Sequence, residues 1–114
     1  KAIEIDPNNV FAYRLRADSK RKLGDYLGAI DDYTKAIEVI EINPKKAYLY
    51  KYRAESKSKL GDNQGAVDDL SKLLEIYPND VNCLSLRASA KRKLGDNEGA
   101  DEDDRKAEKL KNIF

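Results

Sequence analysis

One short phrase occurs three times along the chain at nearly equal spacing. Residues 22–29 read KLGDYLGA, residues 59–66 read KLGDNQGA and residues 93–100 read KLGDNEGA. The glycines of the Leu-Gly-Asp triplets are Gly24, Gly61 and Gly95, which stand 37 and then 34 residues apart. A period of about 34 residues is typical of helix–turn–helix units that bury their apolar faces only against neighbouring units.

The residues around each phrase predict two helices and the turn between them. Apolar residues of Val10–Leu23 recur with helical spacing. Gly24 can end that helix in the left-handed region, and Asp25 suits the N-cap of the next helix. Gly28 and Ala29 are small, so we expect them to let two helices approach closely. The same roles fall to the matching residues of the other two phrases.

The first spacing is longer than the second by three residues, and alignment of the units places the extra residues near positions 39–41. Three residues are nearly one turn of helix. We therefore expect the helix before Pro44 to be about one turn longer than its counterparts, and Pro44 to close the first unit.

Composition narrows the possible functions. The chain has 114 residues, one cysteine and no histidine, and its 22 basic and 21 acidic residues give a net charge of +1. Without histidine, a Cys/His metal site or a Ser–His or Cys–His catalytic pair cannot form. We expect no enzyme activity, no cofactor and no metal. The sequence contains no run of about 18 apolar residues, the length that would indicate a membrane span. We expect a reducing, cytoplasmic location. The chain starts at Lys1, so we also expect it to be part of a larger protein.

The repeat resembles the tetratricopeptide repeat family over nearly the whole chain. This resemblance implies an all-α fold, a right-handed superhelical solenoid of antiparallel helix pairs. It divides the chain into the tail of a preceding repeat (1–7), repeat 1 (8–44, with the insertion near 39–41), repeat 2 (45–78) and repeat 3 (79–114, with a polar C-terminal cap). The matching residues are Tyr13, Ala17, Gly24, Asp25, Tyr26, Ala29, Tyr33, Ala36 and Pro44, then Tyr50, Ala54, Gly61, Ala66, Leu70 and Pro78, then Leu84, Ala88, Gly95, Ala100 and Ala107.

The chain departs from the family pattern by carrying Arg, Ala and Lys where Leu, Gly and Tyr are common. Arg16 and Lys20 lie four residues apart on one helix face, where like charges repel. Acidic pairs at matching places on the second helices can supply counter-ions. A solvated face and a ligand-binding role for the arginines are the alternatives. We predict structural ion pairs within each unit: Arg16–Asp32, Arg53–Asp69 and Arg87–Asp103.

The two ends of the array differ. In the third unit Asp101, Asp104 and Glu108 stand where the first unit has apolar or aromatic residues. Charges there suit a polar end cap; an acidic docking surface is the alternative, and a metal site is disfavoured because the ligand spacing of a calcium loop is missing. At the other end, apolar residues at 3, 5, 10 and 13 would be partly uncovered, so we expect a possible dimer or array contact there.

Charge is segregated between the helices. Each first helix is net positive and each second helix net negative. In the family the first helices line a concave groove, so the resemblance implies that basic and aromatic residues face an extended peptide with acidic residues or a free carboxylate. Solvated charges favoured by the helix dipole are the alternative. The candidate peptide contacts are Phe11, Arg14, Arg21, Lys22, Tyr48, Lys51, Tyr52, Lys59, Arg92 and Lys93.

The best-known peptide mode of the family is a two-carboxylate clamp for chaperone tails. The corresponding residues here are Arg14, Asp18, Tyr52, Asn82 and Leu86, of which only Arg14 is chemically similar, so we expect no chaperone-tail binding. The alternatives to a protein-binding scaffold are an RNA-binding helical repeat, since basic helices and tyrosines permit it, and a structural or self-association module. Nucleic acid is the less favoured partner because no paired base-reading positions are evident.

Overall fold

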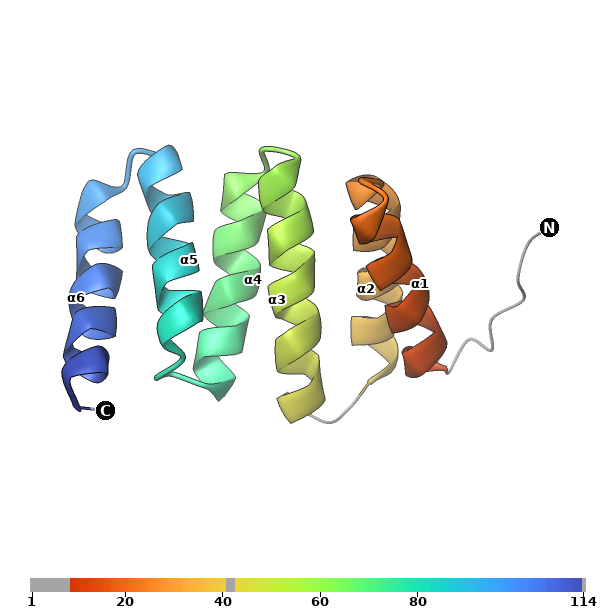
Figure 1. Ribbon diagram of the computed structural model, residues 1–114, viewed down its shortest axis with the longest axis horizontal. Helices are drawn as coiled ribbons and strands as arrows, with labels where there is room; N and C mark the ends of the chain where they lie inside the picture. The colour runs from red at the N-terminus through yellow and green to blue at the C-terminus, as the bar shows by residue number, and fades with distance from the viewer. Residues whose placement is uncertain (1–8, 41–42, 114) are drawn as a thin grey trace.

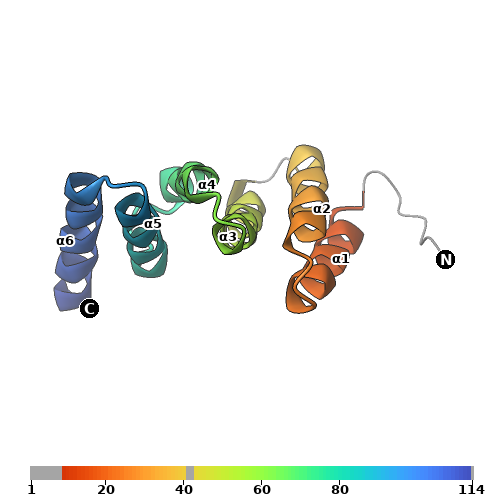
Figure 2. The same cartoon turned by 90° about the horizontal axis from the view of Figure 1, so that it is seen from above.

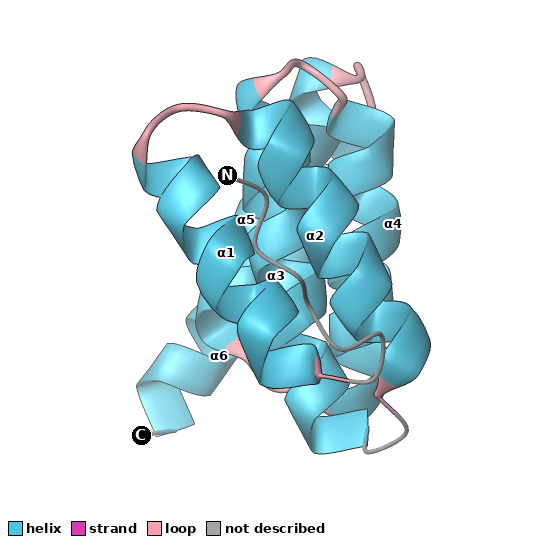
Figure 3. Cartoon of the chain, turned by 90° about the vertical axis from the view of Figure 1, so that its right-hand side faces the viewer, coloured by secondary structure: helices cyan, strands magenta, loops and turns pink. Residues whose placement is uncertain are grey.

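The computed structural model describes residues 9–40 and 43–113 of the chain, and these form six helices with no strand. In Figure 1 the helices stand side by side in chain order, and the body measures 48 × 27 × 19 Å. Figure 3 views the molecule end-on and shows helices joined by short loops. The all-α solenoid expected from the repeat is therefore the fold. The helices are α1 (Val10–Lys22), α2 (Tyr26–Val39), α3 (Asn43–Lys59), α4 (Asn63–Ile76), α5 (Val81–Lys93) and α6 (Asn97–Ile113).

Each helix packs mainly on the helices that precede and follow it in the chain. Seen from above, α1 and α3 lie on one side of the array and α2 and α4 on the other (Figure 2). Two apolar clusters fill the interior. One is formed by the first helix pair together with Leu49 of α3, the other by the second and third pairs, and Tyr50 packs against both. The repeat limits at residues 44 and 78 stay our assignment, and residues 1–7 lie outside the described part.

The repeated phrase forms the turn inside each helix pair. Gly24, Gly61 and Gly95 have φ of 84°, 83° and 86°, and no atom lies within 4 Å of a Cβ built on them. Conformation rather than space therefore requires glycine here. The aspartate that follows caps the next helix: Asp25 Oδ1 accepts a hydrogen bond from the Gly28 N–H at 2.9 Å, and the other two turns repeat this bond.

The second glycine of the phrase has a different role from the one predicted. A Cβ on Gly65 would overlap the carboxylate of Asp62, which is the N-cap of the same helix, and a Cβ on Gly99 would overlap Asp96. A Cβ on Gly28 would overlap Asp25 and also the side chain of Lys20 on the facing helix, so the predicted close approach of two helices holds at this position. The glycine therefore makes room for its own N-cap carboxylate more than for a neighbouring helix.

The predicted extension of the helix before Pro44 is wrong. Helices α2 and α4 both have 14 residues, because Ile40 turns to an extended conformation with φ −78° and ψ 134°. The longer helix is α3, with 17 residues against 13 in α1 and α5. Pro44 lies in the first turn of α3. Proline is tolerated there since first-turn N–H groups have no acceptor within the helix.

Candidate functional site

An ion-pair triad joins the two helices of every hairpin. Its carboxylate is almost fully buried, with Asp32 only 1% exposed. In all three hairpins the arginine Nη2 lies 2.7 Å from one carboxylate oxygen, and a lysine Nζ lies 3.1 Å from the other. The arginine Nε also donates to that second oxygen at 2.7–2.9 Å. The triads are Arg16–Asp32–Lys20, Arg53–Asp69–Lys57 and Arg87–Asp103–Lys91.

Two of the triads lower the pKa of their buried carboxylates. Burial would raise the pKa of Asp32, but hydrogen bonds from Arg16 and Lys20 outweigh it and hold the pKa below its ordinary value. The pKa of Asp103 is lowered in the same way, against burial, by Arg87 and its lysine. Because each carboxylate is saturated by two cations of its own chain, the triads act as structural links and not as a binding site.

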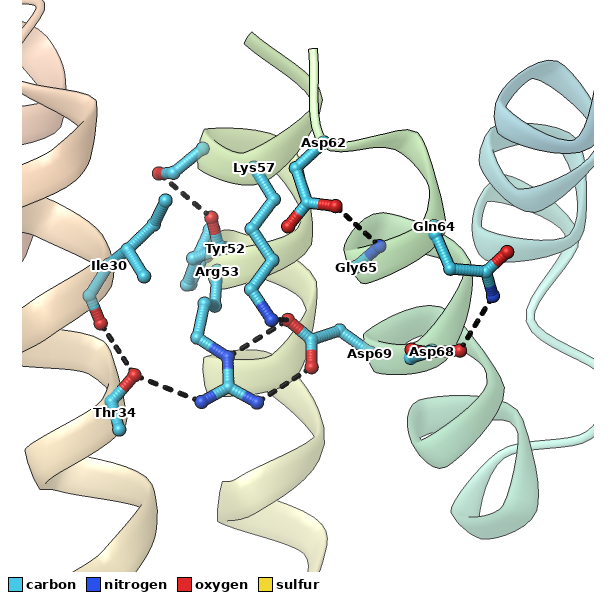
Figure 4. Close-up of polar contacts among 11 residues, drawn as sticks. Ile30, Thr34, Tyr52, Arg53, Lys57, Asp62, Gln64, Gly65, Asp68 and Asp69 are labelled. Atoms are coloured by element: carbon cyan, nitrogen blue, oxygen red, sulfur yellow. Dashed lines mark hydrogen bonds and ion pairs between the residues drawn. The ribbon is translucent and has the colours of Figure 1, made fainter. Parts of the chain in front are cut away.

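Two of the arginines also bind the preceding repeat. Arg53 Nη1 donates to Thr34 Oγ1 at 3.0 Å, and Arg87 Nη1 donates to Ser71 Oγ at 3.1 Å. Figure 4 shows Arg53 between Thr34 on α2 and Asp69 on α4. These links were missed in the sequence, although Thr34 and Ser71 occupy the same place in their repeats.

Arg21, a predicted peptide contact, is engaged inside the molecule. Its Nε donates to the Tyr33 hydroxyl at 3.2 Å, and its guanidinium lies 5.0 Å from the centroid of the Tyr52 ring. Glu55 on α3 lies 3.7 Å from the same guanidinium, and the Tyr33 hydroxyl donates to Asp18. This polar cluster ties the first hairpin to the second.

Arg92 is also paired within the chain. Its guanidinium lies 2.7 Å from both Asp101 and Asp104 on α6. Asp104 occupies the place that Tyr33 holds in the first repeat, so Arg21 and Arg92 make equivalent bonds to their second helices. Arg21 and Arg92 are therefore bonded to groups of their own hairpins, and their role as peptide contacts stays a prediction.

An apolar cleft between α1 and α3 is lined by the three aromatic residues that were predicted as peptide contacts, Phe11, Tyr48 and Tyr52. The cleft has a volume of about 610 Å³, within the usual range of ligand sites. Phe11 and Tyr48 are 61% and 56% exposed, and the Arg14 guanidinium lies 5.4 Å from the centroid of the Phe11 ring. No carboxylate among the described residues forms an ion pair with Arg14. The cleft is lined by Val10, Phe11, Arg14, Ile40, Tyr48, Leu49 and Tyr52.

A second, more open hollow of about 450 Å³ adjoins the cleft on the other side of Tyr48. Tyr77 contributes to its wall, and the rings of Tyr48 and Tyr77 lie 6.4 Å apart. Tyr77 was missed in the sequence because it follows α4 in a loop, outside any helical pattern. Exposed aromatic rings therefore lie at the end of the array where α1, α3 and α5 begin.

The predicted lysines are more scattered. Lys22, Lys59 and Lys93 are exposed in the last turns of α1, α3 and α5, at the far ends of those helices from Phe11 and Tyr48. Lys59 lines a small hollow of about 160 Å³ between α3 and α5. Lys51 is half-buried in the middle of the array. No group of acidic, histidine or cysteine side chains in the described ranges could hold a metal ion.

Two sequence models of the tetratricopeptide repeat match the chain, over residues 12–46 and residues 52–80. Together they span more than half of it. No curated protein sequence matches the chain closely enough to serve as a relative. None of the helices in the described ranges has the length and apolarity to cross a bilayer.

Several solved structures have the same fold. The crystal structure of MamA matches with a TM-score of 0.85 at 19% identity, covering 95% of this chain and 61% of the MamA chain. The first TPR domain of Spaghetti (RPAP3), bound to the HSP90 peptide SRMEEVD, matches with a TM-score of 0.79 at 24% identity, covering 96% of this chain and 84% of the other. The Sgt2 TPR domain from Aspergillus fumigatus matches with a TM-score of 0.77 at 21% identity, covering 90% and 66%. At these identities the similarity shows the fold alone.

Proposed function

The chain belongs to the tetratricopeptide repeat family and is a protein–protein interaction module, and we propose that it binds an extended acidic peptide along the face formed by α1, α3 and α5. The observation that carries this proposal is the cleft at Phe11, Arg14, Tyr48 and Tyr52. Exposed aromatic rings around an arginine are the residue types that dominate binding energy at protein interfaces. An arginine that forms no ion pair with the described residues can pair with a carboxylate of a bound peptide.

The internal contacts divide the predicted peptide residues into two groups. Arg21 and Arg92 are bonded to their own hairpins and shape the walls. The direct contacts that we propose are Phe11, Arg14, Tyr48, Lys51 and Tyr52, with Lys22, Lys59 and Lys93 as a more distant basic rim.

The peptide is not proposed to be a chaperone tail, although one similar structure contains an HSP90 peptide. At one clamp position this chain has Asp18, an acidic group that would repel a carboxylate and that already accepts a hydrogen bond from Tyr33. Another clamp position is Tyr52, which is chemically unlike the clamp residue and lines the apolar cleft. The surface therefore favours a different acidic sequence.

A peptide array of diverse acidic sequences tests the proposal. Tyr48→Ala should weaken peptide binding by about ten-fold or more, and Arg14→Ala, which removes one exposed ion pair, should weaken it by about two- to five-fold. Lys72→Ala is the matched control, because Lys72 is an exposed cation on α4, away from the cleft. If the wild-type chain and both cleft variants bind the same peptides equally well, the proposed groove is wrong.

We also propose that the N-terminal hairpin makes a dimer or array contact. Of the apolar residues predicted to form it, Ile3 and Ile5 lie outside the described part of the chain, and Val10 and Tyr13 are half-buried. At the turn of the same hairpin, Leu23 and Leu27 are 85% and 67% exposed, and exposed apolar surface of this kind favours association. Sedimentation velocity over a range of concentrations should show association that Leu27→Glu weakens; a chain that stays monomeric at all concentrations would contradict it.

We place the module in a reducing compartment such as the cytoplasm, since Cys83 is a buried free thiol whose pKa burial raises to about 12.

A further inference from the structure

The cleft between α1 and α3 differs in kind from the rest of the face. Six of its seven lining residues carry no charge, and Arg14 is the one cation among them. The hollow between α3 and α5 is only about 160 Å³, against about 610 Å³ here. The larger hollow has room for a large apolar side chain together with part of the backbone that carries it.

The sequence explains why the cleft does not recur in the next repeat. One repeat further along, the places of Phe11 and Tyr48 on the first helices are held by Tyr48 and Asn82. The place of Arg14 passes to Lys51 and then to Ser85. Among the described residues, the aromatic and cationic groups of the first helices therefore meet once, between the first and second repeats, at one end of the face.

Arg14 differs from the other arginines near this cleft in what it binds. Arg21 covers the ring of Tyr52 and is already close to Glu55. Arg14 lies against the ring of Phe11 and forms no ion pair with any described residue. A guanidinium that lies against an aromatic ring still has N–H groups at its edge, and these match the two oxygens of a carboxylate.

On the basis of the proposed peptide-binding function, we propose that this cleft recognises a short motif: one large apolar side chain and one aspartate or glutamate two positions away. The apolar side chain enters between Phe11, Tyr48 and Tyr52, and the carboxylate pairs with Arg14. The spacing of two follows from the geometry of an extended peptide, in which residues i and i+2 point to the same side. The apolar anchor supplies most of the affinity, because only one ion pair forms and it lies at an exposed guanidinium.

Selection from a displayed library of random eight-residue peptides tests the motif. Wild-type protein should enrich peptides with Phe, Leu, Ile or Trp two positions from Asp or Glu. Arg14→Glu should keep the apolar preference and replace the acidic residue by Lys or Arg. Tyr48→Ala should reduce enrichment by about ten-fold. Lys72→Glu makes the same charge change on α4 and should select the same peptides as the wild type, and circular dichroism of each variant checks that it is folded.

The outcomes separate this inference from the proposed function. Enrichment of acidic peptides that lack a recurring apolar residue, and that are lost with Arg14→Glu but kept with Tyr48→Ala, would overturn the motif and leave the acidic-peptide function standing. Enrichment of apolar peptides whose neighbouring residue does not respond to Arg14→Glu would overturn the role of Arg14. A library with no enrichment above background would overturn both proposals.

Discussion

Arg53 binds residues from two different repeats at the same time. Its Nη1 donates to Thr34 Oγ1 at 3.0 Å, while Nε and Nη2 donate to the two oxygens of Asp69 at 2.9 and 2.7 Å. The Thr34 hydroxyl in turn donates to the carbonyl of Ile30 at 2.7 Å. One guanidinium therefore fixes the pairing within its own hairpin and the register of that hairpin on the preceding one (Figure 4).

Arg53 and Thr34 should be energetically coupled. Arg53→Ala removes a partner of a nearly buried carboxylate and should lower the free energy of unfolding by about 3 kcal/mol. In a double-mutant cycle with Thr34→Val, the coupling between the two sites should be about 1 kcal/mol, measured by urea denaturation. Lys57→Ala combined with Thr34→Val is the control and should be additive. Additivity of the Arg53 and Thr34 substitutions would contradict the inter-repeat link.

The effect of a methyl group at Gly65 should change sign with the residue at position 62. In the wild type, Gly65→Ala pushes against the Asp62 carboxylate and should cost about 1 kcal/mol through the lost N-cap. In an Asp62→Ala background the obstacle is gone, and the same substitution should stabilise by up to about 1 kcal/mol because alanine favours helix over glycine. Gly61→Ala should cost about 1–2 kcal/mol in either background, since its φ of 83° is unfavourable for any side chain. Thermal unfolding of the set decides; an equal cost of Gly65→Ala in both backgrounds would rule out the cap as the reason for glycine.

The buried carboxylates predict loss of stability in acid. The pKa values of Asp32 and Asp103 lie below their ordinary value in the folded chain. Their contribution is therefore complete above about pH 4, the unfolded pKa, and is lost as pH falls through the lower folded pKa, since the unfolded chain takes up protons first. Asp32→Asn should reduce the pH dependence of the unfolding free energy below pH 4. The exposed neighbour Asp31 is the control, and Asp31→Asn should leave the dependence unchanged. Overlapping curves for Asp32→Asn and wild type, measured by urea titration from pH 7 to pH 2, would contradict this assignment.

Periodicity explains why the structural ion pairs could be predicted. Arg16 and Asp32 each have equivalents in the other two repeats. In each repeat an arginine and a lysine lie one helical turn apart, and these like charges need a counter-ion nearby. The sequence offers an aspartate at one matching position in every repeat. The same periodicity identified the turns and the helix order.

The contacts that the sequence did not indicate involve residues that do not follow the repeat. Tyr33, which binds Arg21, is replaced by Leu70 and Asp104 in the other repeats. No pattern along the chain therefore predicts the contact between Tyr33 and Arg21, because that contact depends on how two helices face each other. Tyr77 was missed for a related reason, because a loop residue has no helical neighbours to place it. A contact that is made in only one repeat cannot be predicted from periodicity and is found only in the three-dimensional structure.

The C-terminal helix differs from the others at the positions that receive the next repeat. The hydroxyls of Thr34 and Ser71 each accept a hydrogen bond from the arginine of the following hairpin, but the equivalent residue on α6 is Arg105. Asp101 and Glu108, both exposed, replace residues that are apolar in the first two repeats. A further repeat of the same type would meet like charge in place of a hydroxyl, and its apolar face would meet carboxylates.

Removing these charges should turn the C-terminal end into a surface that accepts another copy. The variant Asp101→Val/Arg105→Ser/Glu108→Leu restores the apolar and hydroxyl groups of the inner repeats, and the side chain of Arg16, 33% exposed, can then reach the new hydroxyl from a second molecule. Sedimentation velocity should show a larger sedimentation coefficient than wild type at the same concentration, rising further with concentration. Glu102→Val adds a similar apolar group beside the capped face and should sediment as the wild type does. A triple variant that sediments like wild type would mean that charge at these three positions does not end the array.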